Sequence, residues 1–373
     1  QEWPSQERLT RTQPIQGQMI QEYIQNGLNK LPSEQELCFR YHVSRQTVRA
    51  ALAVLENSQE IYRIKGSGAY ITGLSAQVSR NVVGILIPDE QQYQYPAFIS
   101  QLRTALATHS FTCKIFPTFG HQDQERQILR FLLKNPLRAI LVEPVKSALP
   151  TLNTELYPQL RQKGTAIFFL GCTYPELSQL PVLYTNHTYG AHLLVHELTD
   201  KGHTSIAGIF QMDDLRGHMR CQGFLNAMQN QRLTVPDRNI GWFTTEDLDN
   251  FRRNRNINFL KNFLENLTAD CTAIVCENDF IAWLLWEKLS LSSFKPFIEP
   301  KTSGSISEMA LAAFNTSYIT SSGLLRVTTL SYSAHEPAYM AARMISDKLK
   351  GLPVSSQEVP LQLIPSRTSS HAL

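Results

Sequence analysis

The sequence lacks the features that identify most enzymes and membrane proteins. Its 373 residues contain no GxSxG, Walker or HExxH motif, no secretion signal and no apolar run long enough to span a membrane. The six cysteines, at positions 38, 113, 172, 221, 271 and 276, form no CxxC pair. We therefore expect no enzyme activity, no cofactor, no membrane partner and reduced thiols in a cytoplasmic protein.

Metal-ligand spacing is also scarce. His192 and His196 have i, i+4 spacing on a predicted helix, but no further ligand accompanies them. Such a pair is more typical of a solvated helix face, so we expect no metal site.

Excess charge of one sign is missing as well. The chain has 35 Lys or Arg and 32 Asp or Glu, a net charge of +3, and residues 1–75 hold eight basic and seven acidic side chains. Any binding of nucleic acid must therefore come from local placement of charge on one face.

Residues 31–72 carry the clearest local pattern in the chain. Ser33 and Glu36 have the spacing of a capping box, which predicts a short helix over residues 34–40. After a three-residue turn, Ser44 is placed to cap a second helix. In that helix the apolar residues at 48, 51, 52 and 55 follow the i, i+3, i+4, i+7 spacing of a buried stripe.

The polar residues of the second helix cannot share its buried stripe and must face outward. Arg bonds bidentately to guanine and Gln to adenine, which suits a recognition helix in a major groove. Residues 60–72 predict a β-hairpin whose glycines and lysine suit contact with a phosphate or the minor groove. The alternative is an ordinary helical hairpin with solvated arginines. The expected DNA-binding residues are Ser33, Gln35, Ser44, Arg45, Gln46, Thr47, Arg49, Arg63, Lys65, Gly66 and Gly68.

This pattern, LPSE…VSRQTVRAAL…IYRIKGSGAYI, resembles the winged helix-turn-helix of GntR-type bacterial transcription regulators over residues 16–72. The resemblance implies operator DNA as a partner and contacts to it from Arg45, Thr47, Arg49 and the wing glycines. One departure stands out: the family usually has a basic residue where this chain has Gln35. That change removes one charge from the DNA-binding face.

The sequence as a whole predicts an α/β protein with an N-terminal DNA-binding domain. We expect a flexible tail over residues 1–14, the DNA-binding domain over 15–73 with a first helix at 15–26, a linker over 74–81, and an effector domain over 82–373. In the last part, apolar runs alternate with amphipathic segments, which indicates parallel sheets of βαβ units in two lobes. Predicted strands lie at 82–87, 112–116, 139–142, 166–170, 205–209 and 273–276, and predicted helices at 96–109, 122–135, 150–164, 189–201, 215–229, 251–267 and 281–289.

Ligands of such sheets bind beyond the carboxyl ends of the strands, so the polar residues there are the candidate site. Segments such as VGILIPDE, AILVEP, RCQGFLNAM and AIVCENDFIA resemble the effector domain of LacI/GalR-type repressors, and others resemble the arabinose-responsive repressors, which join this domain to a GntR-type reader. The resemblance implies a small, arabinose-like sugar as effector. A sugar needs charged groups for its hydroxyls and aromatic faces for its C–H surface. The expected ligand-binding residues are Tyr93, Tyr95, Glu143, Lys146, Asp214, Arg220 and Asp279.

Two departures from this second family concern the crossings between lobes. Asn186 stands where family members carry Asp at the first crossing, and residues 302–306 replace a Gly-x-Asp-Asp pattern expected at the second. We expect a homodimeric repressor that a sugar releases from a palindromic operator. The alternatives are a regulator whose effector domain only dimerises or takes another ligand, and a sugar-binding receptor without a DNA role.

Overall fold

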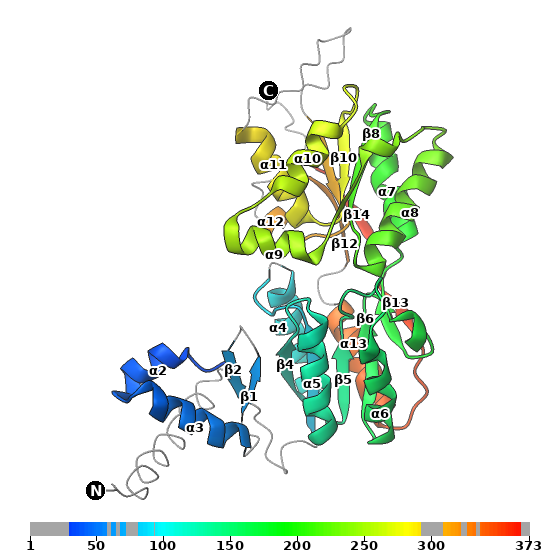
Figure 1. Cartoon of the computed structure of the whole chain (residues 1–373). Coiled ribbons are helices and arrows are strands. Elements are labelled where there is room, and N and C mark those ends of the chain that lie inside the picture. The colour runs from blue at the N-terminus through cyan, green and yellow to red at the C-terminus, as the bar shows by residue number, and fades with distance from the viewer. Residues whose placement is uncertain are drawn as a thin grey trace, which may run out of the picture.

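The protein consists of a small N-terminal domain beside the first of two α/β lobes (Figure 1). The structure, a computed structural model, describes residues 30–57, 61–64, 68–71, 81–92, 94–291, 309–321, 327–332 and 336–366. The predicted tail, the first helix and the linker up to residue 80, together with Lys65, Gly66 and Tyr93, lie outside the described residues.

The N-terminal domain contains two helices and a two-stranded antiparallel sheet. Helix α2 spans Glu34–Tyr41, α3 spans Arg45–Asn57, β1 spans Ile61–Ile64 and β2 spans Gly68–Ile71. The predicted capping box is present, since the Ser33 hydroxyl accepts from the Glu36 amide and the Glu36 carboxylate accepts from the Ser33 amide. His42, in the left-handed region with φ of 51°, ends α2. The predicted stripe is buried in the core of this domain, at Val48, Ala51, Leu52 and Leu55.

The first lobe is a parallel six-stranded sheet in the order β13-β7-β6-β5-β3-β4. Its strands are β3 (Val82–Ile87), β4 (Thr112–Pro117), β5 (Ala139–Val142), β6 (Ala166–Leu170), β7 (Val182–Tyr184) and β13 (Gln357–Glu358). Helices α4 (Tyr95–Ala107) and α13 (Glu336–Leu349) bury their apolar residues on one face, and α5 (Gln122–Lys134) and α6 (Leu156–Gln162) on the other. The 3₁₀ turn η2 (Leu152–Glu155) precedes α6.

The second lobe has a six-stranded sheet in the order β14-β12-β11-β10-β8-β9, parallel except at β14. Its strands are β8 (Ile206–Gln211), β9 (Ile240–Phe243), β10 (Ala273–Cys276), β11 (Ala310–Ala313), β12 (Thr328–Ser331) and β14 (Gln362–Ile364). Helices α7 (His187–Asp200) and α8 (Leu215–Asn230) pack on one face. Helices α9 (Thr245–Asn254), α10 (Asn258–Asn266) and α11 (Asp279–Leu291) pack on the other, next to the short α12 (Tyr318–Ser321).

One sequence prediction about this lobe is wrong, and another falls on residues that the structure does not describe. The single helix expected over residues 251–267 is two helices, because Arg255 adopts a left-handed conformation, with φ of 55°, and ends α9. Residues 302–306, where the second crossing between lobes was expected, lie outside the described residues. The chain returns to the first lobe between β12 and α13.

Candidate functional site: the DNA-binding face and the interlobe cavity

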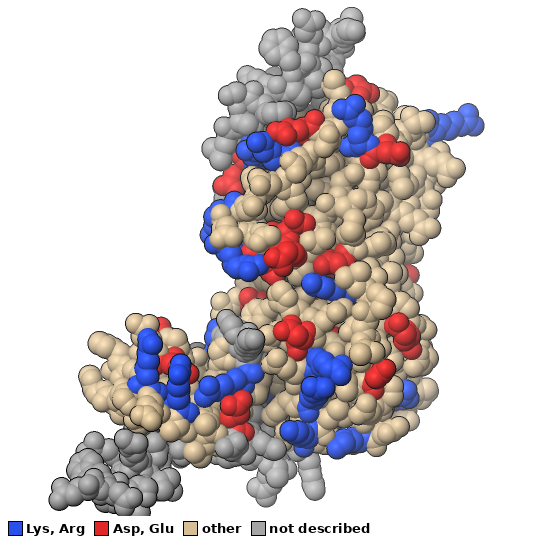
Figure 2. Space-filling model, viewed as in Figure 1, with Lys and Arg blue, Asp and Glu red and all other residues tan. Residues whose placement is uncertain are grey.

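The exposed face of α3 presents the predicted DNA-binding side chains. Arg45, Gln46 and Arg49 are exposed, as their exclusion from the apolar stripe predicts. The Ser44 hydroxyl accepts from the Thr47 amide at 3.2 Å and lies 2.8 Å from the Thr47 hydroxyl, so it caps α3 and holds the Thr47 side chain near the helix start. Lys and Arg side chains lie along this domain in Figure 2.

Acidic residues of the same domain hold two of the predicted DNA-binding arginines. Arg49 Nε lies 2.8 Å from Glu34 Oε2, and this contact raises the pKa of Arg49. Arg63 Nη1 lies 3.8 Å from Glu34, and Arg63 Nε lies 3.3 Å from Glu56. These pairs are largely solvated and therefore weak, so a phosphate or a guanine can displace the carboxylates.

Three other predicted DNA-binding residues lie at the starts of α2 and β2, beside this face. Ser33 and Gln35 are exposed at the start of α2, and Gly68 begins β2 with φ of 121°, a conformation that favours glycine. The sequence pattern predicted the exposure of Arg45 and Arg49 but gave no sign that Glu34 would pair with Arg49, which is 15 positions away.

A second candidate site is a cavity of about 110 Å³ between the two lobes. Loops that follow β3 and β5 line it from the first lobe, and loops that follow β8 and β10 line it from the second. This is the location predicted from the carboxyl ends of the strands. Acidic and basic side chains gather at the level of this boundary (Figure 2). The predicted residues among the lining are Tyr95, Glu143, Lys146, Asp214 and Arg220.

Arg216 lines this cavity and contacts carboxylates of both lobes, and it was not predicted from the sequence. Its Nη2 atom lies 2.7 Å from Glu143 of the first lobe and 2.6 Å from Asp214 of the second. The other oxygen of Glu143 accepts from the Tyr95 hydroxyl at 2.7 Å. Asp214 caps α8 by accepting from the Arg216 amide, and this Asp-x-Arg spacing was the signal that sequence reasoning overlooked.

The Asp214 carboxylate is charged because its partners outweigh its burial. Burial raises its pKa, but the Arg216 guanidinium, with its hydrogen bonds, and Arg220 together lower it to about 2. Burial alone would lower the pKa of Arg216, and the two carboxylates instead raise it well above the ordinary value. The three groups therefore form a charged cluster that joins the lobes.

Arg220, predicted from its position on α8, also lines the cavity. Its Nη1 atom contacts the Glu277 carboxylate and lies 3.0 Å from the Glu277 carbonyl oxygen. Its guanidinium lies over the Phe314 ring, 5.3 Å from the centroid. Burial raises the pKa of Glu277, and Arg220 opposes that shift. The sequence marked residues 277–279 as a strand end but chose Asp279 where the structure places Glu277.

Asp279 lies outside the cavity lining, contrary to the prediction. It is fully buried, and its Oδ2 atom accepts from the Ser317 amide at 2.8 Å, the Ser317 hydroxyl at 2.6 Å and the Thr320 hydroxyl at 3.1 Å. Burial raises the pKa of Asp279, while these bonds lower it. The first residue of α11 points toward the turn that begins α12, so its carboxylate fixes that turn instead of facing the cavity. Asn278, one position earlier, lines the cavity.

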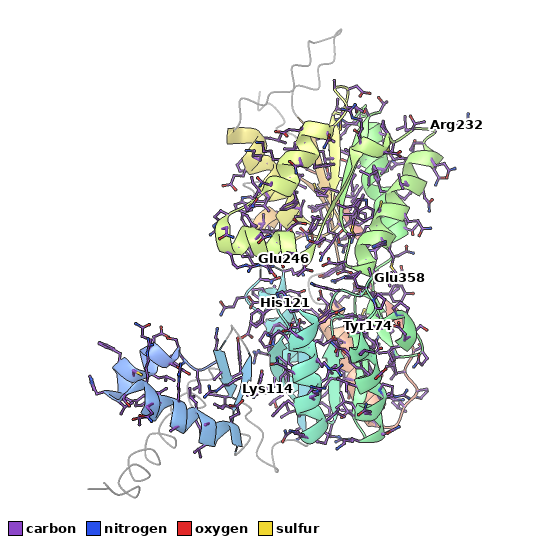
Figure 3. All side chains as sticks on the ribbon, viewed as in Figure 1. Lys114, His121, Tyr174, Arg232, Glu246 and Glu358 are labelled. Atoms are coloured by element: carbon purple, nitrogen blue, oxygen red, sulfur yellow. The ribbon has the colours of Figure 1, made fainter. Side chains whose placement is uncertain are left out.

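Further polar contacts hold the lobes together around the cavity. The Ser147 hydroxyl of the first lobe accepts from the Leu215 amide of the second at 2.8 Å. On another side, His121 Nε2 lies 2.8 Å from Asp249 Oδ2, and Figure 3 shows His121 at the lobe boundary. Asn186, at the first crossing, caps α7 through the Tyr189 amide. The lobes are therefore closed on each other by side chains of both.

Two further observations concern metal binding and membrane-spanning helices. Within the described residues no three His, Cys, Asp or Glu side chains are grouped as for a metal ion, and His196 pairs with Asp200 at 2.9 Å. The described helices include none that combines the length and apolarity needed to cross a membrane.

Comparisons with known proteins match the DNA-binding domain alone and also the chain as a whole. Residues 18–71 match the bacterial regulatory proteins of the gntR family. Across both parts, the chain is 26% identical over 338 residues to an arabinose metabolism transcriptional repressor of Halalkalibacterium halodurans, which covers 88% of this chain and 86% of the relative.

Solved structures are similar in fold to most of this chain. A periplasmic binding protein/LacI transcriptional regulator from Alkaliphilus metalliredigens, complexed with D-xylulofuranose, aligns with a TM-score of 0.61 at 17% identity, covering 77% of this chain and 98% of the other. The transcriptional regulator CelR in its cellobiose complex aligns with a TM-score of 0.63 at 13% identity, covering 90% of this chain and 99% of that chain.

Proposed function

We propose that this chain, which joins a gntR-type DNA-binding domain to a two-lobed domain with the fold of LacI-type regulators, is a repressor released from its operator by a small neutral sugar. The observation that carries the proposal is the cluster of Glu143, Arg216 and Asp214, which joins the lobes at the place where a ligand would lie. A ligand that bonds to these groups changes the contact between lobes and thereby the DNA-binding domain.

The DNA-binding part of the proposal rests on α3 and the wing. The exposed Arg45, Gln46 and Arg49 lie at the start of α3, where a recognition helix contacts base edges. We assign further DNA contacts to Gly66 and Gly68, as the sequence resemblance implies, and to Arg63 and Lys65 because of their charge.

The chemistry of the cavity favours a neutral, hydroxyl-rich ligand. Arg216 and Arg220 are each paired with a buried carboxylate, and Arg252 is paired with Asp249. Such pairs can accept from and donate to adjacent hydroxyl groups without a change of net charge. A phosphate group needs unpaired cations, and among the described lining residues Lys146 is the cation without an ion pair.

The relatives support the choice of sugar. The curated relative from Halalkalibacterium halodurans is named for arabinose metabolism, so L-arabinose is the first ligand to test. In the proposed site, Glu143, Asp214 and Arg220 bond to sugar hydroxyls, Tyr95 packs beside the ring, and Lys146 and Arg216 complete the polar contacts.

One observation favours a second candidate, a regulator whose effector domain only dimerises. Glu143, Asp214 and Glu277 already pair with Arg216 and Arg220 of the lining, and the cavity measures about 110 Å³. A protein that has lost its ligand can retain such a network as a fixed bridge. In both candidates we propose a cytoplasmic homodimer on a palindromic operator, because twofold symmetry of the protein matches that of the site.

Operator binding with and without sugar tests the proposal. A duplex that the protein selects from a random DNA pool is labelled, and its affinity is measured by fluorescence anisotropy at fixed salt with increasing L-arabinose. The proposal predicts weaker DNA binding at saturating sugar, and linkage requires the same factor of weakening in sugar affinity when DNA is bound. DNA affinity that no neutral sugar changes would leave the dimerisation candidate.

A further inference from the structure

Strands β1 and β2 of the DNA-binding domain form its wing, and the wing packs against the first lobe through an aromatic cluster. The ring of Tyr62, on β1, lies 5.5 Å from Tyr70 of the wing, 5.3 Å from Phe131 on α5 and 5.7 Å from Phe116 on β4. Tyr62 and Tyr70 are buried and belong to the same apolar core as Leu132 and Leu156 of the lobe. The wing is thus part of the packing of the first lobe.

A buried lysine of the first lobe makes the polar contact of this junction. Lys114, on β4, is 8% exposed, and its Nζ atom donates to the carbonyl oxygen of Ile71 at the end of β2. Figure 3 shows Lys114 beside the wing, at the edge of the lobe. The salt bridges of the described residues include no carboxylate partner for Lys114, and its burial lowers its pKa to about 7. In this buried position, the Lys114 amine donates to a backbone carbonyl group and, among the described residues, forms no ion pair with a carboxylate.

The position of Lys114 follows from the geometry of β4. This strand is the edge of the first-lobe sheet, and residues two positions apart on a strand share a face, so Lys114 and Phe116 point the same way. That face is the one covered by α5, which supplies Phe131. The wing covers the junction of an edge strand and a helix, a surface that would otherwise expose apolar side chains.

Strand β4 and helix α5 also reach the interlobe cavity, at the ends where the turn between them lies. The turn between β4 and α5 contains Phe119 and Gly120, which line the cavity, and His121, which pairs with Asp249 of the second lobe. The Phe119 amide donates to the Pro88 carbonyl oxygen at 2.7 Å, which fixes the turn to the end of β3. Residues 112–134 therefore form a continuous connection between the cavity rim and the wing.

We propose that the face formed by Lys114, Phe116 and Phe131 is an intramolecular docking site for the wing, and that it holds the DNA-binding domain in one orientation relative to the interlobe cavity. This face lies on β4 and α5, and the turn between these two elements carries His121, which the second lobe contacts. A displacement of the cavity rim is thereby transmitted to the DNA-binding domain through β4 and α5.

Electron–electron distance measurement between two spin labels tests the docking in the full chain. The labels are placed on exposed positions by Phe39→Cys in α2 and Arg130→Cys in α5, in a background with Cys38→Ala and Cys113→Ala. The other four cysteines are buried. Docking predicts one narrow distance population in the parent protein, whereas an untethered domain gives a broad distribution.

Variants on both sides of the junction identify the contact that holds it. Tyr62→Ala removes the wing aromatic and Lys114→Met removes the amine, and each is expected to reduce the narrow population and add a broad one. Tyr62→Phe is the matched control, because the Tyr62 hydroxyl is buried without a hydrogen-bond partner and only the ring is needed. Lys163→Met, at an exposed position of the same lobe, controls for loss of a lysine.

Each outcome decides the proposal. A broad distribution in the parent overturns it, as does a narrow one that both junction variants leave unchanged. Circular dichroism and thermal unfolding of each variant show whether it folds, and if Tyr62→Ala does not fold, Lys114→Met decides. The measurement uses no sugar or DNA, so its result is independent of whether the cavity binds L-arabinose.

Discussion

The Arg216 guanidinium of the second lobe lies 2.7 Å from the Glu143 carboxylate of the first, and this ion pair spans the interlobe cavity. Glu143 is held from its other side by the Tyr95 hydroxyl, and Arg216 by Asp214. A ligand in the cavity must either bridge this pair or replace one member of it. The pair is therefore the place where ligand binding and lobe contact meet.

Replacement of Glu143 by glutamine tests the role of that pair. Glu143→Gln keeps the size of the side chain and removes the charge, so we expect folding and DNA binding to be retained. A lost charge-assisted bond is worth about 1.5–3 kcal/mol, which predicts sugar affinity lower by about 10- to 150-fold. Calorimetric titration measures the change, and the exposed Glu155→Gln is the control. Unaltered affinity would remove Glu143 from the ligand site.

Acid unfolding is expected to depend on Asp214. Its pKa is lowered from an ordinary value of 3.8 to about 2, so its contribution to stability is present above pH 3.8 and is lost as the pH falls through 2. In Asp214→Asn, the stability of the protein should fall less steeply between these pH values. The free energy of unfolding, measured in urea at several pH values, shows the difference. Parallel curves for the two proteins would contradict the charged cluster.

The Glu34–Arg49 pair predicts opposite effects of two substitutions on DNA binding. Arg49→Ala removes a base or phosphate contact and should weaken operator binding by about 1–3 kcal/mol without a change in sugar affinity. Glu34→Gln releases Arg49 and Arg63 from a competing carboxylate and should strengthen binding at low salt. Anisotropy titrations at two salt concentrations measure both. Weaker binding in Glu34→Gln would mean that the carboxylate positions the arginines instead of competing for them.

Gly217 is expected to accept no side chain. A Cβ atom at this position would lie 2.0 Å from the Gln211 carbonyl oxygen, so Gly217→Ala must displace the start of α8 from the end of β8. Arg216 and Arg220 lie in the first two turns of that helix, and we expect reduced thermal stability together with lost sugar binding. Gln222→Ala, at an exposed position of α8, should have neither effect. A stable Gly217→Ala protein would contradict the close contact.

The wing junction should respond to pH. Lys114 has a pKa of about 7 when docked and an ordinary value of 10.5, so the undocked state binds more protons between these values and docking strengthens as the pH rises from 7 toward 10.5. The groups that face the junction include Tyr62 and Glu90, and burial raises the pKa of Tyr62 well above 10. Spin-label distances at pH 7 and pH 9 check this, with Lys114→Met as the insensitive control. A narrow population that grows toward acid pH would refute it.

Much of the fold followed from local pattern. The capping box at Ser33, the stripe from Val48 to Leu55 and the buried run of β3 all depend on interactions between near neighbours, which spacing records. The equally short β5 and β10 were predicted from their uninterrupted apolar runs, whereas β7, β9 and β11 to β14 were not predicted. The break at Arg255 depends on one backbone conformation, which the sequence pattern did not indicate.

The region of the candidate cavity and five of its lining residues were predicted, but Arg216 was not. Strand ends indicated the cavity, yet the partner of Arg216 lies 73 positions away in the other lobe, beyond any sequence period. Asp279 was chosen over Glu277 because it matches the aspartate that the LacI/GalR resemblance implies at this strand end, and the sequence does not indicate which of the two carboxylates faces the cavity. The Ser317 contacts that turn Asp279 away from the cavity depend on the fold of a distant turn.

Calorimetric titration of the full protein with L-arabinose tests the central claim, that the interlobe cavity binds a neutral sugar, most directly. We predict saturable heat with a dissociation constant on the order of micromolar, about −8 kcal/mol, and its loss or strong weakening in Glu143→Gln. An absence of heat with L-arabinose and with related neutral sugars, from folded protein that binds DNA, would contradict the claim and leave the cavity as a fixed bridge between the lobes.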